Sequence, residues 1–143
     1  MKRVYIDGVF DLFHKGHLES LIKAKNVLNN SENTILIVGV VSDLDCMSYK
    51  RKPIIFETDR LDIIKNLKMV DEVIFPCPLI VSPEFIKEHN IDLVVHGFSN
   101  DSDREKQKPF FEKIKDNFIE IEYYSKISTT DIIKNIVNNY KCI

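Results

Sequence analysis

The feature that most constrains the fold is an alternation between short apolar, β-branched runs and longer helical patterns. Apolar runs occupy residues 4–6, 34–41, 72–75 and 93–95, and residues 118–123 alternate apolar and acidic side chains as a half-buried edge strand does. Strands separated by helices in this way predict a parallel sheet that is covered on both faces.

Five apolar stripes with helical spacing accompany these runs. They consist of Leu18, Leu21, Ile22, Ala24 and Leu28; of Leu61, Ile64 and Leu67; of Phe85 and Ile86; of Phe110, Phe111 and Ile114; and of Ile132, Ile133, Ile136, Val137 and Tyr140. Ser82-Pro83 has the sequence of a helix start, with a serine cap before a proline. We therefore expect an α/β fold: a Rossmann-like, doubly wound, five-stranded parallel sheet with helices on both faces, formed by one domain of residues 1–143.

Composition excludes several classes of protein. The chain has 143 residues, 44% of them hydrophobic and 29% charged, which is typical of a globular domain. A net charge of −2 argues against a nucleic-acid-binding surface. No apolar run is long enough to span a membrane, and the N-terminus does not resemble a signal peptide. Cys46, Cys77 and Cys142 are too scattered for a disulfide framework, so we expect a cytoplasmic protein.

The motif that carries chemistry is His14-Lys15-Gly16-His17, which stands where the first strand gives way to the first helix. A helix N-terminus presents free N–H groups and the positive end of its dipole, so it attracts phosphate. Two imidazoles at this point can donate hydrogen bonds to a phosphate, which indicates nucleotide chemistry. Two other interpretations stay open: a structural turn with incidental histidines, and a metal-binding pair, although no third ligand stands at metal spacing.

Three loops are expected at the carboxyl edge of the sheet, where parallel sheets bind their ligands: residues 7–17, 42–58 and 96–108. In the first loop, Gly8 is expected to adopt a backbone angle that other residues resist. Gly16 is expected to leave room for a phosphate at the helix start. The other two are the longest linkers of the chain, and long loops in compact domains often carry function.

Each remaining candidate segment has a structural interpretation beside a functional one. The cations of Tyr49-Lys50-Arg51-Lys52 suit a triphosphate or form a solvated basic loop. Arg60 opposes the dipole in the first turn of its helix, which favours an anionic partner. His96-Gly97 is a ligand-binding pair or a buried histidine with a turn glycine. Ile127-Ser128-Thr129-Thr130 is an anion site or an ordinary N-cap.

Residues 4–17 resemble the signature of the cytidylyltransferase family, and most of all that of the enzymes which activate phosphocholine and phosphoethanolamine with CTP. The resemblance continues in order and spacing through residues 38–43, 70–73, 77–85 and 127–131. It implies that the phosphate of a phospho-alcohol attacks the α-phosphorus of CTP and that pyrophosphate leaves, giving a CDP-alcohol for phospholipid synthesis. It also implies Mg²⁺ held through the triphosphate, and a homodimer paired through residues 70–73.

The resemblance assigns roles to individual residues. His14, His17 and Lys50 would stabilise the charge that develops during transfer. The nucleotide would contact Asp7, Gly8, Val9, Phe10, Asp11, Gly16, Arg60, His96, Gly97, Ile127, Ser128 and Thr129. The phospho-alcohol would contact Asp11, Lys50, Leu79 and Phe98, and Asp11 would also help to hold Mg²⁺.

The chain departs from the family's pattern at several positions. Arg51 replaces a glycine, Gly97-Phe98 replaces an acidic pair, and Leu79 replaces an aromatic residue. Tyr123 stands where the family has a phosphate-clamping arginine. These losses leave open a catalytically weak, nucleotide-binding regulatory homologue. Glycerol-3-phosphate cytidylyltransferase and an adenylyltransferase with the same histidine motif are further alternatives.

Overall fold

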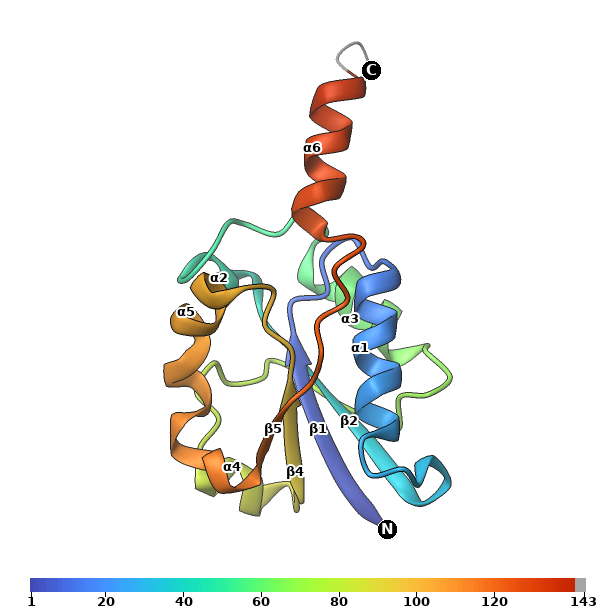
Figure 1. The fold of residues 1–143 in the computed structure, drawn as a ribbon, viewed down its shortest axis with the longest axis vertical. Coiled ribbons are helices and arrows are strands. Elements are labelled where there is room, and N and C mark those ends of the chain that lie inside the picture. Colours follow the sequence, from blue (N-terminus) through green and yellow to red (C-terminus); the bar gives the residue numbers. More distant parts are fainter. Residues whose placement is uncertain (141–143) are drawn as a thin grey trace.

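The computed structural model describes residues 1–140, which form a five-stranded, all-parallel sheet flanked by helices (Figure 1). The elements follow one another as β1 (Lys2–Gly8), α1 (Lys15–Asn26), η1 (Ser31–Asn33), β2 (Thr34–Val40), α2 (Asp43–Met47), α3 (Glu57–Lys65), β3 (Glu72–Ile74), α4 (Pro83–Glu88), β4 (Leu93–His96), α5 (Asp101–Phe111), η2 (Glu112–Asn117), β5 (Phe118–Glu120) and α6 (Thr129–Asn139). Cys142, the third cysteine of the sequence, lies outside the described residues.

The strand order is β3-β2-β1-β4-β5, and every neighbouring pair is parallel. Tyr5 in the central strand is in register with Ile37 of β2 and with Val94 of β4. This order confirms the expected doubly wound, Rossmann-like sheet. The order in which the strands are added reverses between β1 and β4: β2 and β3 lie on one side of β1, and β4 and β5 lie on the other. A doubly wound sheet opens a crevice for ligands at such a switch point.

Two layers of helices cover the two faces of the sheet (Figure 1). Val4 of β1 points into a core that includes Leu21 of α1 and Ile64 of α3. The adjacent Tyr5 points to the opposite face, into a core with Phe85 of α4. The strands β1, β2 and β4 are therefore buried on both sides, which explains why they lack a polar face in the sequence.

The C-terminal helix α6 forms as expected but does not cover the sheet. It projects from the carboxyl edge of the domain (Figure 1), and none of its residues is buried. Its apolar side chains stand largely in solvent, with Ile136 47%, Val137 61% and Tyr140 60% exposed. This apolar stripe adds no buried residue to the domain, because the connection after β5 turns the chain away from the sheet.

Two of the expected long loops are shortened by helices. Ser42 caps α2 by accepting a hydrogen bond from the N–H of Asp45 at 3.1 Å, within the expected loop of residues 42–58. Asn100 caps α5 by accepting from the N–H of Asp103 at 2.8 Å, so the linker after β4 is much shorter than expected. β3 and β5 end one and three residues earlier than their sequence patterns predicted. Across residues 1–140, no helix has the length and apolar character needed to cross a membrane.

Candidate active site

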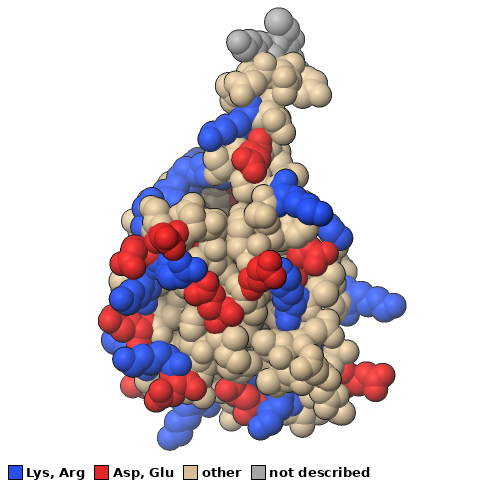
Figure 2. Space-filling model, viewed as in Figure 1, with Lys and Arg blue, Asp and Glu red and all other residues tan. Residues whose placement is uncertain are grey.

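A cavity of about 570 Å³ opens at the switch point, at the carboxyl ends of β1 and β4 and beneath the first turn of α6. Figure 2 shows the hollow below the projecting helix, with Lys and Arg side chains beside it. Among the residues that line it are twelve that the sequence predicted for the site: Asp7, Gly8, Val9, Phe10, His14, Gly16, His17, Lys50, His96, Gly97, Ser128 and Thr129. Segments from both ends of the chain therefore meet at one site.

The start of α1 is built around its two histidines. His14 is the N-cap, and its Nδ1 accepts a hydrogen bond from the Gly16 N–H at 3.0 Å. In return, the Nδ1 of His17 accepts from the His14 N–H at 3.3 Å. A Cβ atom on Gly16 would lie 2.8 Å from Cε1 of His14. Gly16 therefore makes room for the ring of His14, rather than directly for a phosphate.

The backbone of the β1–α1 loop is strained at positions other than the expected glycine. Phe10 and Leu12 have φ angles of 56° and 50°, a left-handed conformation that is costly for side chains of this size. No glycine in the chain has a positive φ, so the expectation for Gly8 is wrong. A Cβ atom on Gly8 would lie 3.0 Å from the ring of Phe10, so Gly8 is needed for close packing instead.

The hydrogen bonds at both histidines define their tautomers. Because each Nδ1 accepts a backbone hydrogen bond, the proton of each neutral ring is on Nε2. The Nε2–H of His14 donates to Oγ1 of Thr129 at 3.2 Å, and that hydroxyl donates to the Asp11 carbonyl at 3.1 Å. The rings of His14 and His17 stack with their centroids 3.9 Å apart. The two rings therefore hold adjacent Nε2–H groups, of which that of His14 already donates to Thr129.

Burial keeps both imidazoles neutral. It lowers the pKa of His17 to about 3, and the nearby His14 and Lys50 lower that pKa further. Burial also lowers the pKa of His14, against the opposing effect of Asp131. Both groups are then hydrogen-bond donors whose protonation does not change near pH 7, which suits them to stabilising charge on a phosphate.

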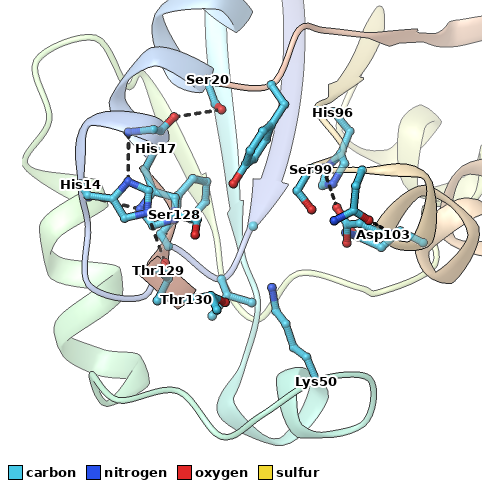
Figure 3. A pocket seen from close by; sticks show the side chains of 18 of the residues that line it. His14, His17, Ser20, Lys50, His96, Ser99, Asp103, Ser128, Thr129 and Thr130 are labelled. Carbon is cyan, nitrogen blue, oxygen red and sulfur yellow. Dashed lines mark hydrogen bonds between the residues drawn. The ribbon is translucent and has the colours of Figure 1, made fainter. Parts of the chain in front are cut away.

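Lys50 supplies a cation between the two sides of the cavity. His14, His17 and Thr129 lie on one side, His96 and Asp103 lie on the other, and the Lys50 amine points between them (Figure 3). The residue as a whole is exposed, but its amine lies among protein atoms, and this desolvation lowers the pKa of Lys50. A phosphate that enters the cavity would therefore meet a cation with few competing water contacts.

The far side of the cavity is acidic. Nδ1 of His96 lies 3.4 Å from Oδ1 of Asp7. The carboxylate of Asp103 accepts hydrogen bonds from the Ser99 N–H at 2.9 Å and from the Gln107 amide at 2.7 Å. Burial alone would raise the pKa of Asp103, but these bonds hold it below its usual value. This half of the cavity is therefore suited to the positively charged or hydroxyl-bearing end of a substrate.

The sequence interpretation missed several of these residues. Ser99, Asn100, Asp103 and Gln107 line the cavity from the start of α5, which had been taken for part of a loop. A signal was present, because Asn100 and Asp103 have the three-residue spacing of a capped helix start directly after a strand.

Two predicted nucleotide-binding residues instead hold the loops in place. The guanidinium of Arg60 is fully buried and donates to the carbonyls of Val9 at 2.6 Å and Val41 at 2.9 Å, and to Oδ1 of Asp43 at 2.6 Å. Both carboxylate oxygens of Asp11 accept backbone N–H bonds, from Ile54 and Ile55, at 2.8 Å. Neither side chain lines the large cavity, and the charged atoms of both are hydrogen-bonded to other groups of the protein.

Three further predicted residues also lie outside the lining of the large cavity. Leu79 packs against a small cluster that includes Val41. Phe98 is 7% exposed and contacts Phe111 edge-on in the core. Ile127 directs its carbonyl toward Gly16, 3.2 Å from the position of a Cβ atom there.

Comparison with known proteins identifies the family. A model of the Cytidylyltransferase-like family matches residues 5–135, which include the β1–α1 loop and the start of α6 that line the cavity. The chain belongs to this family. Its resemblance at the histidine motif is thus part of a match along nearly the whole chain.

Curated relatives of this Cytidylyltransferase-like chain are longer than it is. Mouse choline-phosphate cytidylyltransferase A is 41% identical over 140 residues, which are 96% of this chain and 37% of that protein. A probable ethanolamine-phosphate cytidylyltransferase of Encephalitozoon cuniculi is 31% identical over 134 residues, 93% of this chain and 40% of that protein. The chain therefore spans little more than a third of the length of these relatives.

A crystal structure has the same Cytidylyltransferase-like architecture. It is that of the lipopolysaccharide core biosynthesis protein from Thermoplasma volcanium GSS1, which is 25% identical in sequence and superimposes with a TM-score of 0.65. The match covers 89% of this chain and 99% of that one, so it includes most of the elements described above.

Proposed function

We propose that this chain transfers CMP from CTP to phosphocholine or phosphoethanolamine, releases pyrophosphate and so forms a CDP-alcohol for phospholipid synthesis. The observation that carries the proposal is the convergence of two Nε2–H donors and one lysine on the cavity at the switch point. Relatives with choline-phosphate and ethanolamine-phosphate cytidylyltransferase names support the choice of nucleotide and acceptor.

The reaction needs alignment and charge stabilisation more than proton transfer. An ionised phosphate oxygen of the acceptor forms a bond to the α-phosphorus as the bond between that phosphorus and the bridging oxygen breaks, and the electron pair leaves with pyrophosphate. The Nε2–H of His17 donates to the phosphate oxygens, and the Nε2–H of His14, which also donates to Thr129, is shared with them. Lys50 neutralises charge on the triphosphate, and the N-terminus of α1 adds its dipole.

We propose that Mg²⁺ reaches the site mainly with the nucleotide. Within residues 1–140, no three His, Cys, Asp or Glu side chains gather into a metal-binding group. Asp11, the expected helper, already accepts two backbone hydrogen bonds. Phosphate oxygens of the substrate are therefore the ligands that fit this donor set, and the bound ion would neutralise triphosphate charge.

The proposal extends to assembly and location. We propose that residues 1–143 act as one catalytic domain and pair as a homodimer through residues 70–73, next to the edge strand β3. An edge strand has backbone groups without a neighbour on one side, which favours pairing there. We also place the protein in the cytoplasm, and the free, buried thiols of Cys46 and Cys77 support a reducing compartment.

A pyrophosphate-release screen tests the proposed reaction. CTP and ATP are each combined with phosphocholine, phosphoethanolamine or glycerol 3-phosphate in the presence of Mg²⁺. We expect release with CTP and with at least one of the two amino-alcohol phosphates. Release only with ATP, or only with glycerol 3-phosphate, would assign a different transferase activity. CTP binding without any release would indicate a regulatory homologue.

A further inference from the structure

Arg51 is a cation in the cavity lining. Its backbone carbonyl accepts a hydrogen bond from the Cys46 thiol at 3.3 Å, which ties the residue to the end of α2. Its guanidinium donates to Oγ1 of Thr130 at a long 3.4 Å. Among residues 1–140, no carboxylate forms an ion pair with it, although Arg3, Arg60 and Arg104 all have such partners.

The surroundings of Arg51 increase the positive potential. Thr130 is in the first turn of α6, where the helix presents N–H groups and the positive end of its dipole. Lys50, its neighbour in the sequence, lines the same two cavities and adds a second cation. A guanidinium placed against a helix N-terminus and an ammonium is repelled by both, and an anion between these groups would remove the repulsion.

Two features place the anion at the outer end of a triphosphate. Asp7 and Asp103 occupy the far side of the cavity, so phosphates are favoured on the side of His14 and His17, which Lys50 and Arg51 adjoin. The reacting α-phosphate must lie within reach of the Nε2 atoms of His14 and His17. Arg51 is exposed and lines both the main cavity and an adjoining one of about 40 Å³. It is therefore in position to contact the β- and γ-phosphates of a nucleotide whose α-phosphate lies at the histidines.

We propose that Arg51 is a phosphate-binding residue that holds the terminal phosphates of the nucleotide. The inference rests on the proposed function for the identity of the nucleotide, but not for the presence of a polyphosphate. The guanidinium presents a planar fork of N–H donors that matches two phosphate oxygens, whereas an ammonium acts as a point charge. Arg51 thereby favours a nucleoside triphosphate, or the pyrophosphate product, over a nucleoside monophosphate.

Calorimetric titration of CTP, CMP and pyrophosphate into the whole chain with Mg²⁺ tests the role of Arg51. The variants are Arg51→Gln, the conservative Arg51→Lys, and the control Lys52→Gln. Lys52 is the exposed neighbour, lies outside the cavity lining and loses the same charge on substitution. Circular dichroism and the melting temperature show that each variant is folded.

We expect Arg51→Gln to weaken CTP and pyrophosphate binding by about 10- to 100-fold, the effect of losing hydrogen bonds to a charged group. CMP binding should change by about twofold or less, as should all three affinities in Lys52→Gln, because exposed charges contribute little. Arg51→Lys should fall between Arg51→Gln and the wild type.

Unchanged CTP and pyrophosphate affinity in a folded Arg51→Gln variant would overturn the inference, as would equal losses for CTP and CMP. So would a wild-type protein that binds neither CTP nor pyrophosphate. The proposed function fails separately, if the wild type binds CTP but releases no pyrophosphate with any phospho-alcohol. In that case the pyrophosphate titration still decides the role of Arg51.

Discussion

Nε2 of His14 lies 3.2 Å from Oγ1 of Thr129, a residue 115 positions further along the chain. The same hydroxyl donates to the carbonyl of Asp11, so one side chain connects the first helix of the domain, the strained loop before it and the last helix. The orientation of the His14 imidazole, to which we assign a catalytic role, therefore depends on the start of α6.

Removal of this hydroxyl tests the connection. Thr129→Val keeps the shape of the side chain and removes its donor and acceptor, so we expect kcat to fall about tenfold, roughly the contribution of one or two hydrogen bonds. Thr129→Ser retains the hydroxyl and should stay close to the wild type. Steady-state kinetics with CTP varied will show the difference, and equal kcat values in the two variants would contradict the positioning role.

The two histidines are expected to act on turnover rather than on folding. His14→Ala and His17→Ala each remove an Nε2–H donor, and kcat should fall by about 10²- to 10³-fold, as for the loss of one donor to a charged transition state. His89→Ala is the matched control, because His89 is at the end of α4 and outside the cavity lining. The comparison fails if a folded His14→Ala/His17→Ala double variant turns over at the wild-type rate.

The buried His17 predicts loss of stability in acid. Its folded pKa of about 3 lies below the ordinary value of 6.5, so between these pH values the unfolded chain binds more protons than the folded one. The stabilisation is fully present above pH 6.5 and is lost as the pH falls, by up to about 1.4 kcal/mol per pH unit.

Urea unfolding between about pH 4 and pH 7 measures this slope, because most of the interval between the folded and unfolded pKa values of His17 lies within that range. His17→Asn keeps an acceptor for the His14 N–H and removes the titrating group, so its stability should depend less steeply on pH. Identical slopes in the variant and the wild type would show that other groups cause the acid sensitivity.

Asp43 and Arg60 form an ion pair that fixes the loops beneath the site. The Arg60 side chain is fully buried, whereas Asp43 is 15% exposed, with 2.6 Å between their charged atoms. Asp43→Ala leaves a buried guanidinium without its carboxylate, so we expect a loss of about 3–5 kcal/mol in the free energy of unfolding. Asp59→Ala, at an exposed position of α3, the helix that contains Arg60, should cost about 1 kcal/mol or less. Urea denaturation distinguishes the two, and equal costs would mean that the buried pair contributes little.

The elements that local patterns specify were predictable from the sequence. Ser82-Pro83 predicted the start of α4, and Ser82 does accept the capping hydrogen bond, from the Phe85 N–H at 3.1 Å. The loop containing His14 and His17 was placed correctly at the carboxyl edge of the sheet. It directly follows β1, so it must begin at the carboxyl end of that strand. Caps and periodicity depend on neighbours within a few residues, so one sequence is sufficient to show them.

Residues whose partners are distant in the chain were not predictable. Arginine usually lies at the surface, so burial of Arg60 was not expected. Its buried guanidinium is hydrogen-bonded to carbonyls 51 and 19 positions away in the chain. The apolar stripe of α6 has the spacing of a core helix, but its direction depends on the connection after β5. Asp103 lines the cavity through a turn of α5 that only the tertiary fold brings to β1.

The place of α6 has a consequence for biosynthesis. A ribosome makes all five strands, and every side chain buried in the two cores, before it reaches Ser128. The sheet can thus form on a nascent chain while His14 still lacks its hydroxyl partner. A product clipped ahead of that serine would keep its hydrophobic interior but would lose one wall of the cavity, so the proposed site is complete only once residues 128–131 have been made.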